Sequence, residues 1–582
     1  MTNYIYNSVN VTSGSYSLDL SGVAPTTVTP SGSFPASGLP AGVVSLQVEG
    51  ATSGAIGTGN FTIFISYQTT ADGEWTVNSK WDTNVNPNSP SVKTHIANNI
   101  TIPESNTIEV DEITIDENAS LHNNGSTFTI NGNIILKNGA DNKSAKFLNN
   151  GNLINRGKII IRKSFSRTFG WYFMSFPFDV PADRIFIAGT NTIARWGDPT
   201  TAATSTNDFY VSEYDGAKRD NTGVVNYTID SPNWKDVTPH TLIAKKGYII
   251  AVPGDIEIDF VSGSQESALF STTSSNVSVN KYLNNSYQQH NSWNLIGTPY
   301  ASAYDLKYAT EAPFYHYNNV NYDVVMSGDN VVLNPYTSFF LQATTNTVDF
   351  NISGKALIRS QVAVNTFDEI NLQLNGPSYS DKTRLRFDDN ASTDYIIGQD
   401  AVKMFSPVTG VPQIYSKIGS YPVAVNTLPR NINTVDLTIK TPVTGSYSIT
   451  LNNSELAKSY SVIKLIDNLT GKQQDLLTDN TYNFTSSSTT ASTRFKVVLT
   501  GNSNTGIDNI SDNRITVYSI QNKTFIEGIE NQADINVYDT TGKLISTFNN
   551  ITNKQAIEIN YNGMVVLRIC EGNRIYNVKT NL

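Results

Sequence analysis

Two pairs of neighbouring carboxylates are the first residues in the chain that could do chemistry. Asp111–Glu112 and Asp116–Glu117 lie on either side of a short apolar run. Clustered carboxylate oxygens are the ligands that Ca²⁺ prefers, and two opposed carboxylates can cleave a glycosidic bond. These four residues are therefore candidates for a calcium site or a polysaccharide-cleaving pair, and we expect no other cofactor. The alternative is solvated corner residues, since a lyase would also need Lys or Arg, and this span has few.

The histidines do not form a catalytic pattern, and the usual catalytic motifs do not occur in the sequence. None of the five histidines forms the His-Glu-x-x-His pattern of a zinc hydrolase; they are His95, His122, His240, His290 and His316. No nucleophile elbow, P-loop or dinucleotide-binding glycine motif occurs where a strand would lead into a helix. We therefore name no catalytic residue and expect that the chain is not an enzyme.

Aromatic side chains are a third source of function. The chain has 29 Tyr, 25 Phe and 6 Trp, and an exposed ring can stack on a sugar. We predict glycan contacts at Trp75, Trp81, Trp196 and Trp234. The alternative is packing in the core or at a sheet edge, because aromatic residues are frequent in β-strands.

Composition favours strands and excludes several classes of function. Charged residues make up 15 % of the chain, against about 25 % in an average globular protein, and Asn, Ser and Thr take their place. These residues favour turns and strands over helices. The net charge of −10 argues against a nucleic-acid-binding surface, which needs clustered Lys and Arg. The single cysteine, Cys570, excludes an intrachain disulfide, and no apolar run is long enough for a transmembrane helix.

Short apolar runs between turn residues predict how the chain is divided. We expect an all-β, elongated, multidomain chain of β-sandwiches with a segment like a parallel β-helix or solenoid. The predicted regions are a partial immunoglobulin-like sandwich (1–70), the solenoid-like segment (71–165), a β-rich domain (166–354), a second sandwich (355–500), a linker (501–512) and a C-terminal module (513–582).

The solenoid-like segment is predicted from β-branched runs that recur between Asn–Gly corners. Ile113–Ile115 and Ile134–Leu136 are two of the runs, and Asn124–Gly125, Asn131–Gly132 and Asn150–Gly151 are three of the corners. Such corners tolerate a left-handed backbone, so each strand can stack its apolar side chains on the strand of the previous rung. A sandwich with many hairpins is the alternative.

Two echoing phrases mark the β-rich domain. Gly170–Phe178 and Ser292–Ala303 both run from Trp through apolar residues to Pro and an aromatic residue. Because Pro cannot donate a hydrogen bond to a ladder, each Pro should lie at an edge or a strand end. We expect one domain here, and two similar halves would account for the echo.

The C-terminal module contains four short apolar runs, and Asp539–Lys543 between the second and third suits a tight hairpin turn. At Ile535–Ile545 the sequence resembles the C-terminal sorting domain of proteins exported by the type IX secretion system of Bacteroidota. Those domains carry a Val-Tyr-Asp-x-x-Gly-Lys hairpin, then a Gly before an apolar strand, and a final Tyr-x-x-Lys strand. The matching residues are Val537, Tyr538, Asp539, Gly542, Lys543, Gly563 and Lys579.

Upstream segments carry the same resemblance. Ser292–Ala303 is similar to a phrase that is common in large secreted Bacteroidota proteins. Asp400–Lys403, Asp467–Gly471 and Arg494–Phe495 match the Asp-Ala-x-Lys, Asp-x-x-Thr-Gly and Arg-Phe marks of the sandwich that often precedes the sorting domain.

The resemblance implies a non-catalytic, adhesin-like or stalk protein at the cell surface or in the medium. The C-terminal module would be recognised by the type IX secretion machinery and then replaced by a link to surface lipopolysaccharide. Glycans or proteins of other cell surfaces would be further partners. The alternative is an accessory, glycan-binding C-terminal part of a secreted polysaccharide-degrading enzyme. Because Met1–Ile5 lacks the regions of a signal peptide, we expect a longer precursor or a leader already removed.

Overall fold

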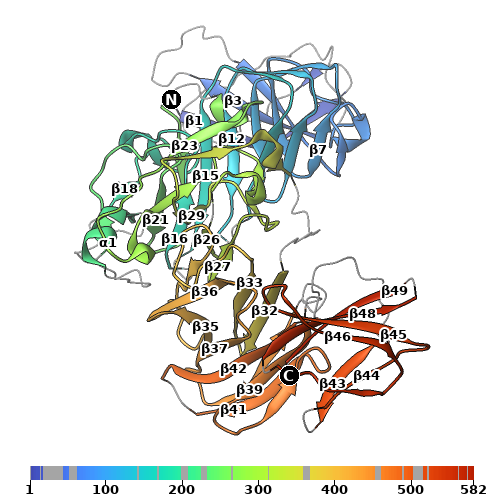
Figure 1. The fold of residues 1–582 in the computed structure, drawn as a ribbon. Coiled ribbons are helices and arrows are strands. Elements are labelled where there is room, and N and C mark those ends of the chain that lie inside the picture. The colour runs from blue at the N-terminus through green and yellow to red at the C-terminus, as the bar shows by residue number, and fades with distance from the viewer. Residues whose placement is uncertain are drawn as a thin grey trace. The chain divides into compact units, whose positions relative to one another are not determined.

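The described residues form two compact units whose regular elements are mostly β-strands. The computed structural model describes residues 2–12, 15–16, 43–50, 62–140, 143–166, 170–197, 208–223, 233–263, 267–311, 313–357, 368–452, 460–487, 490–501, 515–520, 523–561, 563–572 and 574–581. The units are Met1–Asn502 and Ser503–Leu582. Apart from 3-10 turns and one α-helix in this part of the chain, α1 (Gly216–Thr222), the elements are strands (Figure 1). The predicted all-β, multidomain fold is confirmed.

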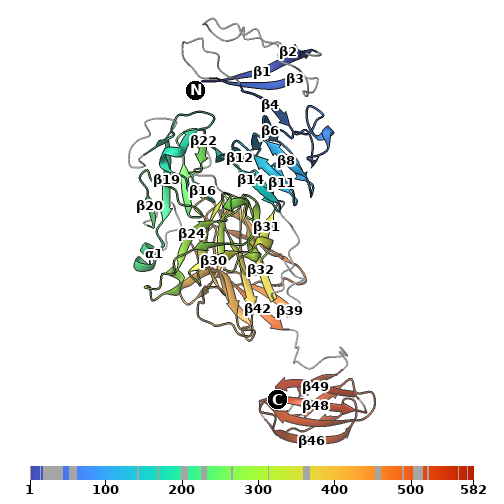
Figure 2. The ribbon, with the colours of Figure 1, turned by 90° about the horizontal axis from the view of Figure 1, so that it is seen from above.

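Three parallel ladders organise residues 73–165 (Figure 2). The first contains β6 (Val92–Ile96), β9 (Glu112–Ile115), β12 (Ile134–Asn138) and β15 (Ile159–Phe165). The second contains β5 (Gly73–Glu74), β7 (Asn99–Ile102), β10 (Ser120–Asn123) and β13 (Lys146–Asn149). The third contains β8 (Thr107–Val110), β11 (Thr127–Ile130) and β14 (Asn152–Asn155).

The ladders enclose an apolar core. From β6 to β14, each pass of the chain adds one strand to each ladder. Ile113, Ile134 and Ile159 lie in register on successive passes, and all three are fully buried. We call residues 73–165 the ladder segment, and we keep the predicted solenoid as an interpretation of its pairing.

The glycines at two corners of the ladder segment are needed for close packing. A Cβ on Gly151 would lie 2.3 Å from the Ser126 carbonyl oxygen, and one on Gly157 would lie 1.8 Å from that of Gly132. Each of these oxygens belongs to the preceding pass, so only a hydrogen fits where one corner stacks on the next. The left-handed backbone expected at such corners occurs at Gly125, with a φ of 91°, and not at Gly151 or Gly157.

The first ladder continues as one sheet past the boundaries predicted at residues 70 and 165. On one side β4 (Thr62–Gln68) pairs in parallel with β6, and β3 (Val43–Gly50), β1 (Thr2–Thr12) and β2 (Ser15–Tyr16) follow. On the other side come β22 (Ile256–Val261) and β17 (Ile185–Ile187), both antiparallel to their neighbours. The strands described in residues 1–70 all belong to this sheet. The facing sheet that the predicted sandwich needs is not among the described residues.

The middle of the first unit is built from two halves with the same strand pairing. In the first half β16 (Tyr172–Ser175) pairs with β21 (Gly247–Ala251), β21 with β19 (Asp208–Tyr214), and β19 with β20 (Trp234–Asp236). In the second half β24 (Trp293–Gly297) pairs with β29 (Ser338–Gln342), β29 with β26 (Phe314–Tyr317), and β26 with β27 (Tyr322–Val325). All these pairs are antiparallel. The two echoing phrases form β16 and β24, and each strand ends before its Pro.

The two halves exchange backbone hydrogen bonds in a symmetric way. The Ser175 amide at the end of β16 donates to the Tyr336 carbonyl at 3.0 Å, and the Gly297 amide at the end of β24 donates to the Lys245 carbonyl at 2.9 Å. Tyr336 and Lys245 lie shortly before β29 and β21, and both have a φ of 67°. Each half therefore ends its first strand on the turn that leads into the other half's last strand. We call these four residues the strand joint.

Smaller sheets flank this middle region. β23 (Ser275–Ser278) pairs with β30 (Thr347–Phe350), and β25 (Ala303–Asp305) lies between β28 (Val332–Leu333) and β31 (Lys355–Ala356). β18 (Arg195–Trp196) pairs in parallel with β19.

Residues 368–501 form one continuous sheet of eleven strands. Its strands are β32 (Asp368–Asn375), β33 (Ser380–Phe387), β34 (Ala401–Val402), β35 (Gln413–Ile418), β36 (Tyr421–Leu428), β37 (Thr434–Lys440), β38 (Gly445–Leu451), β39 (Tyr460–Asp467), β40 (Gln473–Asp475), β41 (Thr481–Ser486) and β42 (Ser492–Gly501). Buried side chains from both ends of the strand order meet in one core, for example Ile449 on β38 and Leu465 on β39. The sheet therefore curls around its own apolar face, and we call it the curled sheet.

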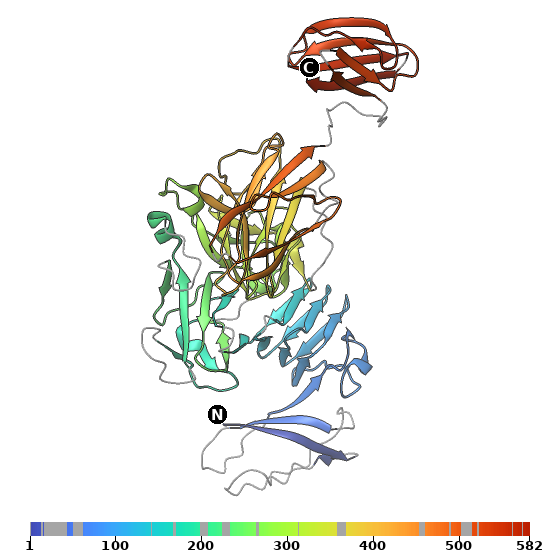
Figure 3. The same cartoon turned by 90° about the horizontal axis from the view of Figure 1, so that it is seen from below.

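The C-terminal unit contains two sheets around its own core (Figure 3). One sheet contains β43 (Thr516–Ile520), β44 (Lys523–Glu527) and β47 (Ala556–Ile557). The other has the order β46 (Leu544–Ile551), β45 (Ala533–Asp539), β48 (Met564–Glu571) and β49 (Arg574–Asn581). Alternate residues of β45 and β48 are buried, among them Ile535, Val537, Val565 and Leu567. This period of two is what a sheet with one buried face requires.

We expect Gly297→Ala to destabilise the first unit, because the new Cβ would lie 2.2 Å from the Ser175 Cβ across the strand joint. Forcing the strands apart should cost about 1–3 kcal/mol. Thermal unfolding followed by circular dichroism should therefore show a lower midpoint. Gly263→Ala is the control, since its Cβ would meet Pro181 at 3.5 Å. Equal midpoints for the two variants would contradict the importance of the joint.

Candidate functional site

The predicted carboxylates of the ladder segment are matched by basic side chains. Glu112 and Asp116 are four residues apart, so they share a face of the sheet. A Glu112 oxygen lies 3.7 Å from Lys93 Nζ. The two Asp116 oxygens each lie 2.7 Å from a basic nitrogen, one from His95 Nε2 and the other from Lys137 Nζ. Burial would raise the pKa of Asp116, but the bonds from His95 and Lys137 outweigh it, so the pKa is lowered.

The remaining two predicted carboxylates do not complete a metal site. Asp111 is half-buried and Glu117 is exposed. In the part of the chain that the structure describes, no three His, Cys, Asp or Glu side chains come together as a metal ion would require. The calcium prediction therefore has no described cluster to rest on, and Glu112 and Asp116 belong to ion pairs that cross from strand to strand.

Two of the four tryptophans predicted to contact glycans are core residues. Trp75 and Trp81 are each 1 % exposed, and their rings pack edge to face with centroids 4.8 Å apart. The Trp75 indole donates to the Pro87 carbonyl, and that of Trp81 donates to the Trp75 carbonyl. The prediction of glycan contacts is therefore wrong for both residues, because no ring face is open to a sugar.

The other two tryptophans are half-buried and do not offer a flat platform. The Trp196 indole donates to the Val237 carbonyl at 2.9 Å. Trp234 meets Phe173, Tyr214 and Phe340 with angles of 63° to 77° between ring planes. At such angles the edge of one ring meets the face of another, so this cluster has the geometry of packing between two sheets.

The motif residues that were matched in the curled sheet form buried ion pairs and hydrogen bonds. Arg494 reaches Asp467 through two bonds, Nε to Oδ1 at 2.9 Å and Nη2 to Oδ2 at 2.7 Å. Asp467 is fully buried. Burial opposes its ionisation, but the hydrogen bonds from Arg494 and its neighbours outweigh burial and lower its pKa to about 2. The Asp-x-x-Thr-Gly and Arg-Phe marks, 27 residues apart, therefore form one bidentate pair.

The Asp-Ala-x-Lys mark is also structural. The Asp400 carboxylate accepts the backbone amides of Ile396 and Thr427 at 2.9 and 2.8 Å, and burial raises its pKa to about 6. Lys403 Nζ lies 2.6 Å from both carboxylate oxygens of Asp381, and both side chains are buried. These contacts hold the segment 396–403, which contains β34, against β33 and β36.

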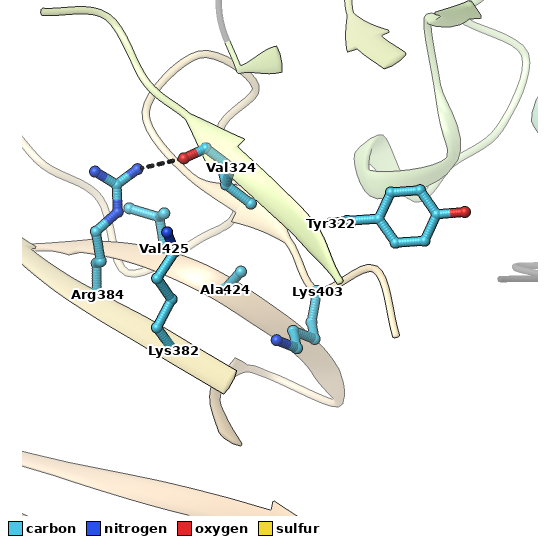
Figure 4. A pocket seen from close by; sticks show the side chains of 7 residues that line it. All are labelled: Tyr322, Val324, Lys382, Arg384, Lys403, Ala424 and Val425. Atoms are coloured by element: carbon cyan, nitrogen blue, oxygen red, sulfur yellow. Dashed lines mark hydrogen bonds between the residues drawn. The ribbon is translucent and has the colours of Figure 1, made fainter. Parts of the chain in front are cut away.

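A buried cluster of charges connects the second half of the middle region to the curled sheet. Asp329 follows β27, whereas Arg384 and Arg386 lie on β33. The two Asp329 oxygens lie 2.7 Å from Arg384 Nη1 and Arg386 Nη2, and Glu369 lies 2.7 Å from Arg386 Nε. Arg384 Nη2 also donates to the Val324 carbonyl at 3.1 Å (Figure 4). All four charged side chains are 10 % exposed or less.

A small cavity lies beside this cluster. Its volume is about 10 Å³, which is about the space for one water molecule. The side chains that line it are Tyr322, Val324, Lys382, Arg384, Lys403, Ala424 and Val425 (Figure 4). A ligand does not fit, so we interpret the charges as a clamp between two regions. The clamp could not be predicted from the sequence, because Asp329 lies 55 residues before Arg384 and no motif links them.

The hairpin predicted for the C-terminal unit is present. Asp539 Oδ1 accepts the amides of Thr541 and Lys543 at 2.8 and 2.9 Å and the Thr541 hydroxyl at 2.6 Å. Gly542 has a φ of 85°, and Gly563 has a φ of 132° directly before β48. The Asp and Gly types in this turn are therefore explained by local bonding and backbone conformation.

The structure brings two of the predicted motif residues into one row on the outer face of the four-stranded sheet. The row runs across the strands as Leu544, Tyr538, Val566 and Lys579. Its neighbours in the core are Val537, Val565 and Val578, so the row faces away from the core. Leu544 is 50 % exposed, and Lys579 is exposed as well. Tyr538 and Lys579 are thus aligned although 41 positions separate them.

No protein-family model matches the chain, and the search of curated proteins found no match. Within the described residues, no helix is long and apolar enough to cross a membrane. Any functional proposal therefore rests on the residues and contacts above.

We expect Asp329→Ala to weaken the clamp strongly, because it leaves the buried Arg384 and Arg386 with one carboxylate between them. Removing one partner of a buried ion pair typically costs about 3–5 kcal/mol. Lys382→Ala is the control, since Lys382 is 47 % exposed in its pair with Asp323, and such pairs contribute roughly 0–1 kcal/mol. Limited proteolysis should cleave the Asp329 variant faster than wild type. Equal cleavage rates for both variants would refute the clamp.

The Asp467–Arg494 pair should make the free energy of unfolding depend on pH in the acid range. The pKa of Asp467 is lowered from 3.8 to about 2, so its contribution is complete above pH 4 and disappears as pH falls through 2. We expect Asp467→Asn to lose about 3 kcal/mol at pH 7 and to approach wild type near pH 2. Urea denaturation across this pH range measures it. Asp436→Asn, at an exposed pair, should change little, and a constant Asp467→Asn deficit at all pH values would be inconsistent with the pair.

Proposed function

We propose that the chain is an exported, surface-attached, non-catalytic adhesin-like protein whose C-terminal unit is its sorting and anchoring signal. The observation that carries this proposal is the outer row of the C-terminal unit, which aligns Tyr538 with Lys579. These residues come from separate parts of the motif that resembles the type IX sorting domain. A motif whose distant parts form one surface is suited to recognition by a partner.

The division of the chain supports the same proposal. The C-terminal unit begins at Ser503 and has its own core. A signal that is removed after export has to be separable from the rest of the protein, and a self-contained unit meets that requirement. The partners would be the type IX secretion machinery and, after sorting, surface lipopolysaccharide.

The chemistry of the first unit favours an adhesin over an enzyme. Glu112 and Asp116 of the ladder face are engaged in ion pairs, and the charges of the clamp and of the Asp467–Arg494 pair are buried. Groups held in this way serve stability, whereas a general acid or base has to reach a substrate. The second candidate is a glycan-binding accessory part of a secreted polysaccharide-degrading enzyme. Exposed tyrosines of the first unit favour it, for example Tyr287 and Tyr308, which are 55 % and 40 % exposed, because an exposed ring can stack on a sugar.

Export of single-residue variants tests the proposed signal. The full chain, behind a leader for the periplasm, is expressed in a Bacteroidota host with a type IX system. We expect Tyr538→Ala and Lys579→Ala to remain mostly in the periplasm, because each removes a side chain from the outer row. The measurement is the fraction of protein on the cell surface and in the medium.

Asn577→Ala is the matched control for this experiment. Asn577 is exposed, lies on the same strand and face as Lys579, and belongs to the adjacent row with Arg568. It should be exported like wild type. Export of a chain that ends at Asn502 would refute the sorting role of the C-terminal unit, and normal export of both row variants would refute the role of the row.

A further inference from the structure

We propose that the side chains of Lys403 and Asp381 become joined by an amide bond, which covalently links two segments of the curled sheet. Asp381 lies on β33, and Lys403 directly follows β34. Lys403 Nζ lies 2.6 Å from Oδ1 and 2.6 Å from Oδ2 of Asp381. Because the nitrogen is equally close to both oxygens, it faces the carboxyl carbon between them. Such a bond is independent of the export role proposed above.

Burial distinguishes this pair from a lysine–aspartate pair of similar length in the ladder segment. The Lys403 and Asp381 side chains are both 4 % exposed. Lys137 Nζ lies 2.7 Å from one oxygen of Asp116, and these side chains are 31 % and 25 % exposed. Water at an exposed pair hydrates both charges and favours hydrolysis of an amide over its formation, whereas a closed site excludes water. The buried pair is therefore suited to condensation, and the exposed pair is not.

The backbone of the curled sheet holds both side chains in position. Asp381 lies opposite Leu374 in the ladder between β33 and β32. The Lys403 amide donates to the Pro422 carbonyl of β36 at 2.9 Å. Reacting groups that are fixed in contact behave as if their effective concentration were about 10⁵–10⁸ M. This advantage offsets the unfavourable equilibrium for condensation of an amine with a carboxylic acid in water.

The bond forms by a condensation that needs no further reagent. One proton passes from the Lys403 ammonium to the Asp381 carboxylate, which leaves a neutral amine and a carboxylic acid. The lone pair of Nζ then forms a bond to Cγ. The bond from Cγ to the hydroxyl oxygen breaks, its electron pair leaves with that oxygen, and a proton from Nζ completes one water molecule. Two opposite charges thus disappear from a buried site, where each is costly to hold.

Two features around the pair assist this reaction. The Ile414 amide donates to Asp381 Oδ2 at 2.8 Å. A donor in this position stabilises the negative charge that develops on Oδ2 during attack, so Oδ1 is the oxygen that leaves. Lys403 also lines the cavity beside the clamp, whose volume of about 10 Å³ is about the space for one water molecule (Figure 4). The released water can therefore move away from the new amide.

The mass of the purified full chain tests the cross-link. We expect the mass of wild type to be lower than that of its sequence by one water molecule. After digestion with trypsin, residues 360–382 should be joined to residues 387–417, because trypsin does not cleave after a lysine whose amine is acylated. Tandem mass spectrometry of this branched peptide should locate the bond between Asp381 and Lys403.

Two arginine variants provide the matched comparison. Lys403→Arg keeps a positive charge beside Asp381 but has no amine to form this bond, so its mass should equal that of its sequence. Lys137→Arg changes the exposed pair with Asp116 and should remain lighter than its sequence by one water molecule. Circular dichroism of Lys403→Arg shows whether the variant is folded, and the peptide map of wild type decides the question if it is not.

Three results would overturn the cross-link. The first is a wild-type chain with the full mass of its sequence. The second is a loss of water that persists in Lys403→Arg, and the third is a loss that maps to residues other than Asp381 and Lys403. Each of these results would leave the outcome of the export assay unchanged.

Discussion

The strand joint is the constraint on which the first unit depends. Lys245 and Tyr336 hold a left-handed backbone, which is unfavourable for residues with a side chain. Each offers its carbonyl to an amide of the other half, and the Met174–Thr337 and Lys246–Ile296 bridges continue the exchange on both sides. The first half packs on the ladder segment, and the second meets the curled sheet through the clamp. The joint therefore connects the ladders to the curled sheet.

Ion pairs also join separate strands or regions of the first unit, in three places. Asp116 joins neighbouring strands of the ladder face, Asp329 joins two regions, and Asp467 fixes two strands of the curled sheet. With few charged residues in the chain, most of those below the surface are matched by an opposite charge or by backbone amides.

Local patterns could be read from the sequence, and distant contacts could not. The Asp539–Gly542 hairpin was predictable because its conformation depends on residues within the turn, and the strands that end before Pro177 and Pro299 follow from proline itself. The basic partners of Asp116 come from one pass before and one pass after it, so counting Lys and Arg near the acid missed them. The sequence could not place Trp75 and Trp81 in the core, because tryptophan suits both a core and a sugar site.

The symmetry of the middle region has a consequence for how such a domain can arise. Alone, one half would leave an amide at the end of its first strand and a left-handed carbonyl before its last strand without partners. A second copy of the same half would supply both, by the rule that a two-fold interface exchanges equivalent contacts. The middle region thus resembles a homodimer whose two subunits are joined in one polypeptide. Because the connecting chain holds the two halves together, their association does not depend on protein concentration.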